Sequence, residues 1–164
     1  MKKWKIQKTL LIVGEGFSDV AFLNHIKQFP GVCGQGTQIT IKNARGHGAS
    51  GVINWTIRQI ANVSYDKVAV MIDTDANWDQ KVASLARRHK IQVVASDPCI
   101  EALLLRVLGQ NLLAAKDLKT QLAPFVKNDP LTSANYAENF GRDVLVAARA
   151  REAAIEDLLV LFDI

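Results

Sequence analysis

The chain is poor in cysteine and contains no long apolar run. Its two cysteines, Cys33 and Cys99, are too few for a disulfide scaffold among 164 residues and show no metal-ligand spacing. No stretch approaches the length needed to span a bilayer. The apolar run at residues 10–13 is too short for the core of a signal peptide, and the acidic Glu15 follows closely. We therefore expect a cytoplasmic protein that is neither secreted nor embedded in a membrane.

The chain also lacks the motifs of the common nucleotide-binding loops. The turn at residues 14–16 begins like a dinucleotide-binding motif, but its third glycine would fall at Asp19, and Glu15 would repel a pyrophosphate. No Walker A lysine is present. We expect the two glycines of this turn to let the backbone bend sharply, so that Glu15 projects over the edge of a sheet.

The composition is that of an ordinary folded domain. Apolar residues make up 49% and charged residues 22% of a chain long enough to bury a core. The net charge of +4 gives mild support for a polyanionic partner such as nucleic acid. Two basic clusters are candidate contacts to a nucleic-acid backbone, with solvated surface as the default: Lys2, Lys3, Lys5 and Lys8, and residues 87–90.

Strands alternate with helices up to residue 108. Short apolar or alternating runs predict strands at residues 9–13, 38–42, 68–72 and 91–95. Capping residues and helical spacing predict helices from the N-cap Ser18 to just before Pro30, and at residues 52–61, 78–89 and 98–108. This order indicates an α/β, Rossmann-like fold with a mostly parallel four-stranded sheet flanked by helices.

The remainder of the chain contains no convincing strand. We expect residues 1–109 to form the α/β core and residues 110–164 a helical extension packed on it. The extension is predicted to hold a short helix near residues 115–122 and one long amphipathic helix over residues 144–162.

Three carboxylates stand at the carboxyl ends of two predicted strands. Glu15 follows the first strand, and Asp73 and Asp75 follow the third. If these strands are neighbours in a parallel sheet, the acids meet at the edge where open α/β sheets carry their sites. Their repulsion is costly unless a cation neutralises them, and Mg²⁺ or Mn²⁺ is the natural cation for oxygen ligands. Alternatively, Asp73 and Asp75 cap the helix that follows.

Further residues near these strand ends are candidates for the same site. Glu101 lies in the first turn of an otherwise apolar helix, where an unpaired buried acid is expensive, so we expect it to join or support the metal site. Its alternative role is favourable placement near the helix dipole, and Asp97 is expected to cap that helix. The remaining candidates, for support or for contact with nucleic acid, are Asp19, Arg45, His47, Trp78 and Ser96; Trp78 would either stack on a base or pack in the core.

These motifs resemble the hallmark of the Toprim domain: a glutamate after the first strand, often as E-G-x-x-D, and a D-x-D after a later strand. Here they are E-G-F-S-D at residues 15–19 and D-T-D at residues 73–75, and the resemblance covers residues 9–108. The family includes DnaG-type primases, topoisomerases, OLD-family nucleases and small rRNA-maturing nucleases. Residues 96–105 further resemble the S-x-P-x-x-E segment of RloB-like Toprim proteins, which are linked to restriction and phage defence. By that resemblance Glu101 joins the metal site.

The resemblance implies a nuclease dependent on Mg²⁺ or Mn²⁺, acting on DNA or RNA in phage defence or nucleic-acid processing. In the resulting hypothesis, Asp73 and Asp75 bind one metal ion. Glu15 binds a second ion or acts as general base, and Glu101 completes the cluster. Beyond nucleic acid, the partners implied are an ATPase or further copies of the chain. Topoisomerase and primase activities are disfavoured, because no strand-passing domain or tyrosine module accompanies the core.

Two alternatives stay open. A non-catalytic Toprim module would bind nucleic acid or a partner protein without turnover. A receiver-type phosphoacceptor also gathers acids at strand ends, but it needs a lysine at a late strand end. The fourth predicted strand instead runs into Ser96-Asp97-Pro98, so the phosphoacceptor ranks last.

Overall fold

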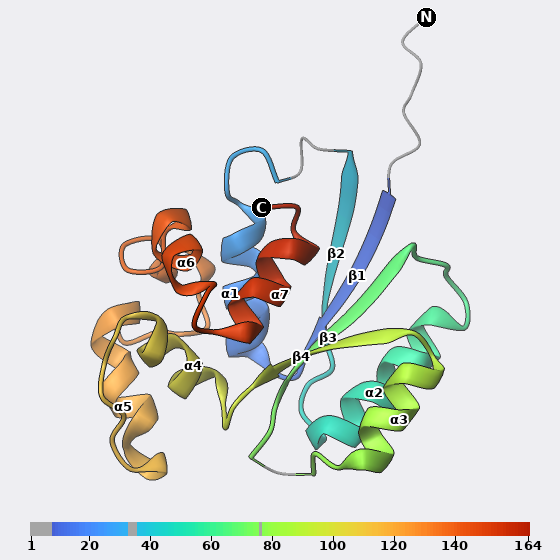
Figure 1. Ribbon diagram of the computed structural model, residues 1–164, viewed down its shortest axis with the longest axis horizontal. Coiled ribbons are helices and arrows are strands. Elements are labelled where there is room, and N and C mark those ends of the chain that lie inside the picture. The colour runs from blue at the N-terminus through green and yellow to red at the C-terminus, as the bar shows by residue number, and fades with distance from the viewer. Residues whose placement is uncertain (1–7, 33–35, 76) are drawn as a thin grey trace, which may run out of the picture.

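The four predicted strands form one parallel sheet. The computed structural model describes residues 8–32, 36–75 and 77–164. Over these residues the strand order is β2-β1-β3-β4, and each neighbouring pair is parallel (Figure 1). The strands are β1 (Lys8–Gly14), β2 (Thr37–Asn43), β3 (Lys67–Asp73) and β4 (Ile91–Ser96). The predicted α/β fold is confirmed, and the sheet is parallel throughout.

Helices cover both faces of this sheet. One face is covered by α2 and α3, and the other by α1, α4 and the C-terminal helices (Figure 1). Successive side chains of β1 enter the two cores in turn: Leu10 lies in the α1 core and Leu11 in the α2 core. This alternation buries the strand on both faces. The four helices are α1 (Phe17–Lys27), α2 (Gly48–Ile60), α3 (Gln80–Arg88) and α4 (Ile100–Val107).

The C-terminal part of the chain shares the core beneath α1 and α4. Leu118 and Leu158 belong to the same buried cluster as Phe22 of α1. The short helical elements of this part are η2 (Ala115–Asp117), α5 (Leu118–Leu122), η3 (Ala123–Val126) and η4 (Ser133–Tyr136). They are followed by α6 (Arg142–Ala148) and α7 (Ala153–Leu161). The helical character predicted for this region is therefore observed.

The single long helix predicted over residues 144–162 is wrong, because the chain breaks between α6 and α7. At the break, the carboxylate of Glu152 accepts two hydrogen bonds from the guanidinium of Arg106, at 3.0 and 3.2 Å. Arg151 donates to the carbonyl of Val107 at 2.7 Å. These bonds tie the turn to the end of α4, and such long-range partners leave no mark on the local spacing of apolar residues.

The start of α4 also differs from the prediction. Cys99 is its N-cap, so Pro98 precedes the helix rather than opening it. Asp97, expected to cap the helix, instead accepts a hydrogen bond from the hydroxyl of Thr74 at 2.7 Å. Although Asp97 is close to α4 in sequence, its carboxylate is bonded to the residue that follows β3 and not to the helix.

Within the described ranges, no helix is both long and apolar enough to cross a membrane. Cys99 is a free thiol, whereas Cys33 lies outside the described residues. Lys2, Lys3 and Lys5 of the amino-terminal basic cluster also lie outside them.

Candidate acidic site at the carboxyl edge of the sheet

The pairing of β1 with β3 brings Glu15 to Asp73. Gly14 pairs with Met71 in the parallel register, and the N–H of Glu15 continues the ladder by donating to the carbonyl of Met71 at 3.1 Å. One carboxylate oxygen of Glu15, Oε2, then accepts a hydrogen bond from the N–H of Asp73 at 2.9 Å. Two acids that are far apart in sequence therefore meet at one edge of the sheet, as parallel pairing predicts.

Asp73 in turn reaches α4. Its Oδ1 accepts a hydrogen bond from the N–H of Ile100, the first residue of that helix, at 3.0 Å. The capping alternative is therefore correct in kind, but for a different helix. The next helix along the chain, α3, is capped by Asp79, whose carboxylate accepts from the N–H of Val82 at 2.9 Å. Asp75 is exposed and Glu101 is half-buried beside this junction.

Asp19 is the buried acid of the site, with 5% of its surface exposed. Its Oδ2 accepts a hydrogen bond from the N–H of Gly16 at 3.0 Å, which makes Gly16 the N-cap of α1 and the predicted cap Ser18 wrong. Its Oδ1 is buried and has no hydrogen-bond partner among the described residues. An unpaired carboxylate oxygen in the interior is costly unless the group is protonated or meets a cation.

Gly14 is needed for the close approach of α1 to the strand. A Cβ on Gly14 would lie 3.0 Å from the Cβ of Asp19 and 3.0 Å from the Cγ2 of Val20. Neither Gly14 nor Gly16 has a left-handed backbone, and Gly16 is extended at φ −140°. The predicted bend is present at residues 15 and 16, without a left-handed glycine. Gly14 also lets α1 approach the strand closely.

Burial and mutual repulsion raise the pKa values of the two central acids. Burial, followed by the charges of Asp19, Glu15, Asp75 and Glu101, raises the pKa of Asp73 to about 8. Burial raises the pKa of Asp19 to about 7 against the opposing hydrogen bond from a backbone N–H, and the charges of Glu15 and Glu101 add to the rise. The charges of four other carboxylates therefore act on Asp73 at this edge. A bound cation would lower both pKa values again.

An open pocket of about 360 Å³ adjoins these acids. Asp73, Asp75 and Glu101 line it from the α/β core, and Lys116 and Lys119 line it from the C-terminal extension. Neither lysine is among the site residues predicted from the sequence. Their spacing around the apolar Leu118 of a short helix is a local signal, but it does not show which surface they face.

Cys99 also lines this pocket and is half-buried. Burial raises the pKa of its thiol to about 11, and the neighbouring Glu101 and Asp73 contribute in the same direction. The thiolate is the nucleophilic and metal-binding form of cysteine. At neutral pH this residue is therefore a neutral wall of the pocket.

The loop between β2 and α2 lies against Glu15. The N–H of Gly46 donates to the backbone carbonyl of Glu15 at 2.7 Å, so the flanking Arg45 and His47 are near the acidic edge and are exposed. Arg45, Gly46 and His47 all have left-handed φ values, 60°, 89° and 77°. The structure thus brings both predicted basic residues to the correct edge, without showing a ligand for either.

The last two predicted residues have different environments. Trp78 is half-buried and packs against the α2 core, so the packing alternative describes it. Ser96 lies opposite Asp73 in the sheet register and is fully buried. Its hydroxyl oxygen has no hydrogen-bond partner in the part of the chain that the structure describes. Ser96 therefore adds a second unsatisfied oxygen at the carboxyl end of β4, the edge strand beside β3.

The donor set fits a hard divalent cation in kind. In the described residues, no three histidine, cysteine or acidic side chains form a ready-made metal centre. The available groups are nevertheless oxygen donors, and Asp19 and Ser96 each hold a buried oxygen without a partner. The backbone bonds of Glu15 and Asp73 occupy only one oxygen of each carboxylate. Metal binding at this edge would therefore require the acidic side chains to close around the ion.

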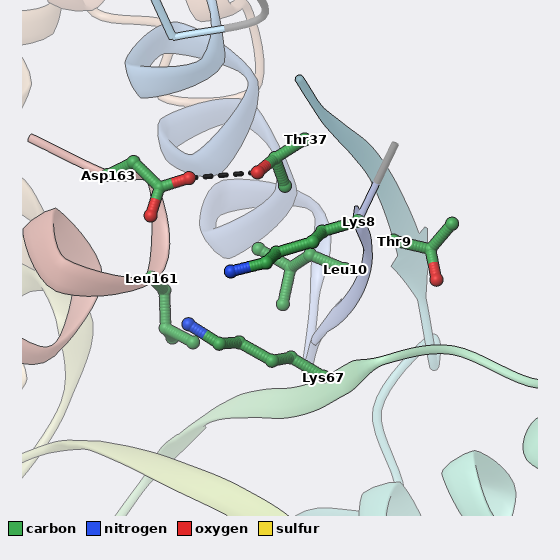
Figure 2. A pocket seen from close by; sticks show the side chains of 7 residues that line it. All are labelled: Lys8, Thr9, Leu10, Thr37, Lys67, Leu161 and Asp163. Carbon is green, nitrogen blue, oxygen red and sulfur yellow. Dashed lines mark hydrogen bonds between the residues drawn. The ribbon is translucent and has the colours of Figure 1, made fainter. Parts of the chain in front are cut away.

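A smaller pocket lies at the opposite, amino edge of the sheet (Figure 2). The side chains of Lys8 and Lys67 point into it, beside a hydrogen bond of 2.9 Å from the hydroxyl of Thr37 to Asp163. Its volume of about 30 Å³ has room for little more than a water molecule. The acidic edge is therefore the stronger candidate for a functional site.

Comparisons with protein families, with curated proteins and with solved structures find no match for this chain.

Proposed function

We propose that this chain is a Toprim-type enzyme that uses Mg²⁺ or Mn²⁺ to hydrolyse phosphodiester bonds of nucleic acid. The observation that carries the proposal is the convergence of five carboxyl groups on one sheet edge, with a buried oxygen of Asp19 left unpartnered. Such a cluster destabilises the metal-free fold, because like charges disfavour ionisation. Groups with strongly perturbed pKa values beside a pocket are typical of functional sites.

The chain's own residues divide the work as follows. Asp73, Asp75 and Glu101 would hold a divalent ion beside the pocket, and this ion supplies charge stabilisation to the phosphate oxygens when bound. Glu15 would hold a second ion or accept the proton of the attacking water. Asp19 would fix the position of Glu15 through the N–H of Gly16.

The test is cleavage of single- and double-stranded DNA and RNA in the presence of Mg²⁺ or Mn²⁺. Glu15→Gln and Asp73→Asn should lower the rate by more than the roughly 10- to 100-fold typical of residues that only orient metal ligands. The matched control is Glu138→Gln, which removes an exposed acid from the extension. Equal rates in all four proteins, or no cleavage by the wild type, would contradict the proposal.

A second candidate is a non-catalytic module that binds nucleic acid or a partner protein. It is favoured by the backbone hydrogen bonds of Glu15 and Asp73, since these bonds give both acids a structural role that needs no chemistry. This candidate predicts binding of oligonucleotides without any product. The cytoplasmic setting and the partner ATPase or homo-oligomer stay predictions of the sequence.

A further inference from the structure

The pocket beside the acids has a second wall, which the C-terminal extension forms and which carries basic side chains. Lys116 of η2 and Lys119 of α5 line the pocket together with Asp73, Asp75 and Glu101. The two lysines are three residues apart in consecutive helical turns, so their side chains lie on one side. Both are exposed, and neither forms a salt bridge with a carboxylate of the described residues. Their charges are therefore available to a ligand in the pocket.

The helical segment that carries these lysines, η2 and α5, is held in place by apolar packing and by side-chain hydrogen bonds. Leu118 and Leu122 are 3% and 2% exposed and anchor α5 beside α4 (Figure 1). Gln121 accepts a hydrogen bond from the N–H of Leu113 at 3.0 Å and donates to the carbonyl of Asn111 at 2.7 Å. The segment that leads from α4 into the lysines is thus tied to the helix that carries them. A rigid backbone beneath the two lysines lowers the entropic cost of binding a ligand.

We propose that Lys116 and Lys119 form a phosphate-binding subsite that holds the backbone of a single-stranded nucleic acid beside the acidic edge. The inference rests on the proposed function and adds the substrate class and the residues that hold it. Lysine binds phosphate as a point charge. A phosphate group in this pocket would form ion pairs with two ammonium groups that have no salt-bridge partner among the described residues.

The size of the pocket selects the single strand. A volume of about 360 Å³ lies near the lower end of the range for small-ligand sites, roughly 300–1,000 Å³. One flexible strand can place a nucleotide there. A stiff duplex keeps its bases paired inside the helix and can present only the phosphates of one backbone at the pocket mouth, so it fills the pocket less well than a single strand.

The alternative is that the lysines only offset the charge of the acids. The two roles differ in their response to salt, because each phosphate contact to a single strand contributes about 0.7 to the slope of log K against log salt concentration. Loss of both contacts should therefore reduce the magnitude of this slope by about 1.4. A purely intramolecular role leaves the slope unchanged.

The experiment compares the double variant Lys116→Ala/Lys119→Ala with the control Lys67→Ala/Arg58→Ala, in which Arg58 lies in the last turn of α2. The control removes the same charge from two exposed residues at the amino edge of the sheet. Binding of a labelled oligonucleotide, single-stranded or duplex, is measured by anisotropy over a salt series in Mn²⁺. All proteins carry Glu15→Gln so that cleavage does not consume the probe. We expect the smaller slope for the single strand in the lysine variant alone, and its recovery in Lys116→Arg/Lys119→Arg.

Three results would overturn the inference: an unchanged slope, a slope that falls equally in the control, or tighter binding of duplex than of single strand by the protein that keeps both lysines. A parallel measurement separates this failure from failure of the proposed function. The rise of the unfolding midpoint in Mn²⁺, measured with Glu15 intact, should be retained when the two lysines are removed. If the wild type shows neither this rise nor cleavage but the slope still falls, the subsite stands and the enzyme does not.

Discussion

Asp19→Asn, which removes the buried charge of the acidic edge without changing its shape, is expected to stabilise the metal-free protein above neutral pH. The carboxyl is 5% exposed and its Oδ1 lacks a partner, so the charged form is poorly solvated. The amide oxygen of asparagine can still accept the N–H of Gly16 that Asp19 accepts at 3.0 Å. The cap of α1 is therefore retained while the charge is lost.

The magnitude follows from the pKa of Asp19. In the unfolded chain the carboxyl ionises above its ordinary pKa of 3.8, whereas in the folded protein it keeps its proton up to about 7. Between these values the folded state binds more protons, so the free energy of unfolding falls as pH rises. At about 1.36 kcal/mol per pKa unit the full loss is about 4 kcal/mol. Between pH 5 and pH 8 only the two pKa units from pH 5 to about 7 contribute, which is about 2.7 kcal/mol. Coupling to Asp73 lowers the share that one substitution recovers to about 2 kcal/mol.

The assay is urea unfolding followed by circular dichroism at pH 5 and pH 8, with a chelator present. Asp19→Asn should gain stability relative to the wild type on going from pH 5 to pH 8, whereas Glu138→Gln should follow the wild type. Addition of Mn²⁺ at pH 8 should then stabilise the wild type more than Asp19→Asn. The reasoning is refuted if both proteins lose stability equally between the two pH values, or if the variant is the less stable one at pH 8.

Three further substitutions test the surroundings of the site. Gly14→Ala should displace Asp19, because the new Cβ would lie 3.0 Å from the Cβ of Asp19. We expect a lower unfolding midpoint and a smaller rise of that midpoint in Mn²⁺. A rise equal to that of the wild type would contradict the close approach. Arg106→Lys should lower the free energy of unfolding in urea by about 1.5–3 kcal/mol, because the two hydrogen bonds from the guanidinium to Glu152 are lost. A change near zero would mean that the break between α6 and α7 does not depend on these bonds. Tyr136→Phe should cost about 1 kcal/mol through loss of the hydroxyl bond of 2.8 Å to a backbone carbonyl, and a stabilised variant would contradict that bond.

Much of the α/β core was predictable because its signals are local. A strand buried on both faces must be continuously apolar, and residues 10–13 and 68–72 show this directly. The parallel arrangement then follows from alternating strands and helices. Since parallel strands end at the same edge, the meeting of Glu15 with Asp73 was predictable on the condition that their strands are neighbours, and the pairing of β1 with β3 meets that condition.

The helix boundaries were less predictable, because their partners are distant in sequence. Asp73 caps α4 from another strand, and Glu152 breaks the predicted long helix by meeting Arg106. Neither bond affects the spacing of apolar residues. The second requirement at Gly14 was not predictable for a similar reason: it is set by the side chain of Asp19 packed against it.

The sequence by itself determined the four strands, their parallel direction and the acids at their carboxyl ends, because hydrophobic period and chain order act locally. Only the tertiary structure decided that Asp19 is buried with an unpaired oxygen, since burial depends on how closely α1 approaches the sheet. The tertiary structure also decided that Lys116 and Lys119 face the acids. Their direction depends on the packing of α5 against α4, which no local pattern encodes.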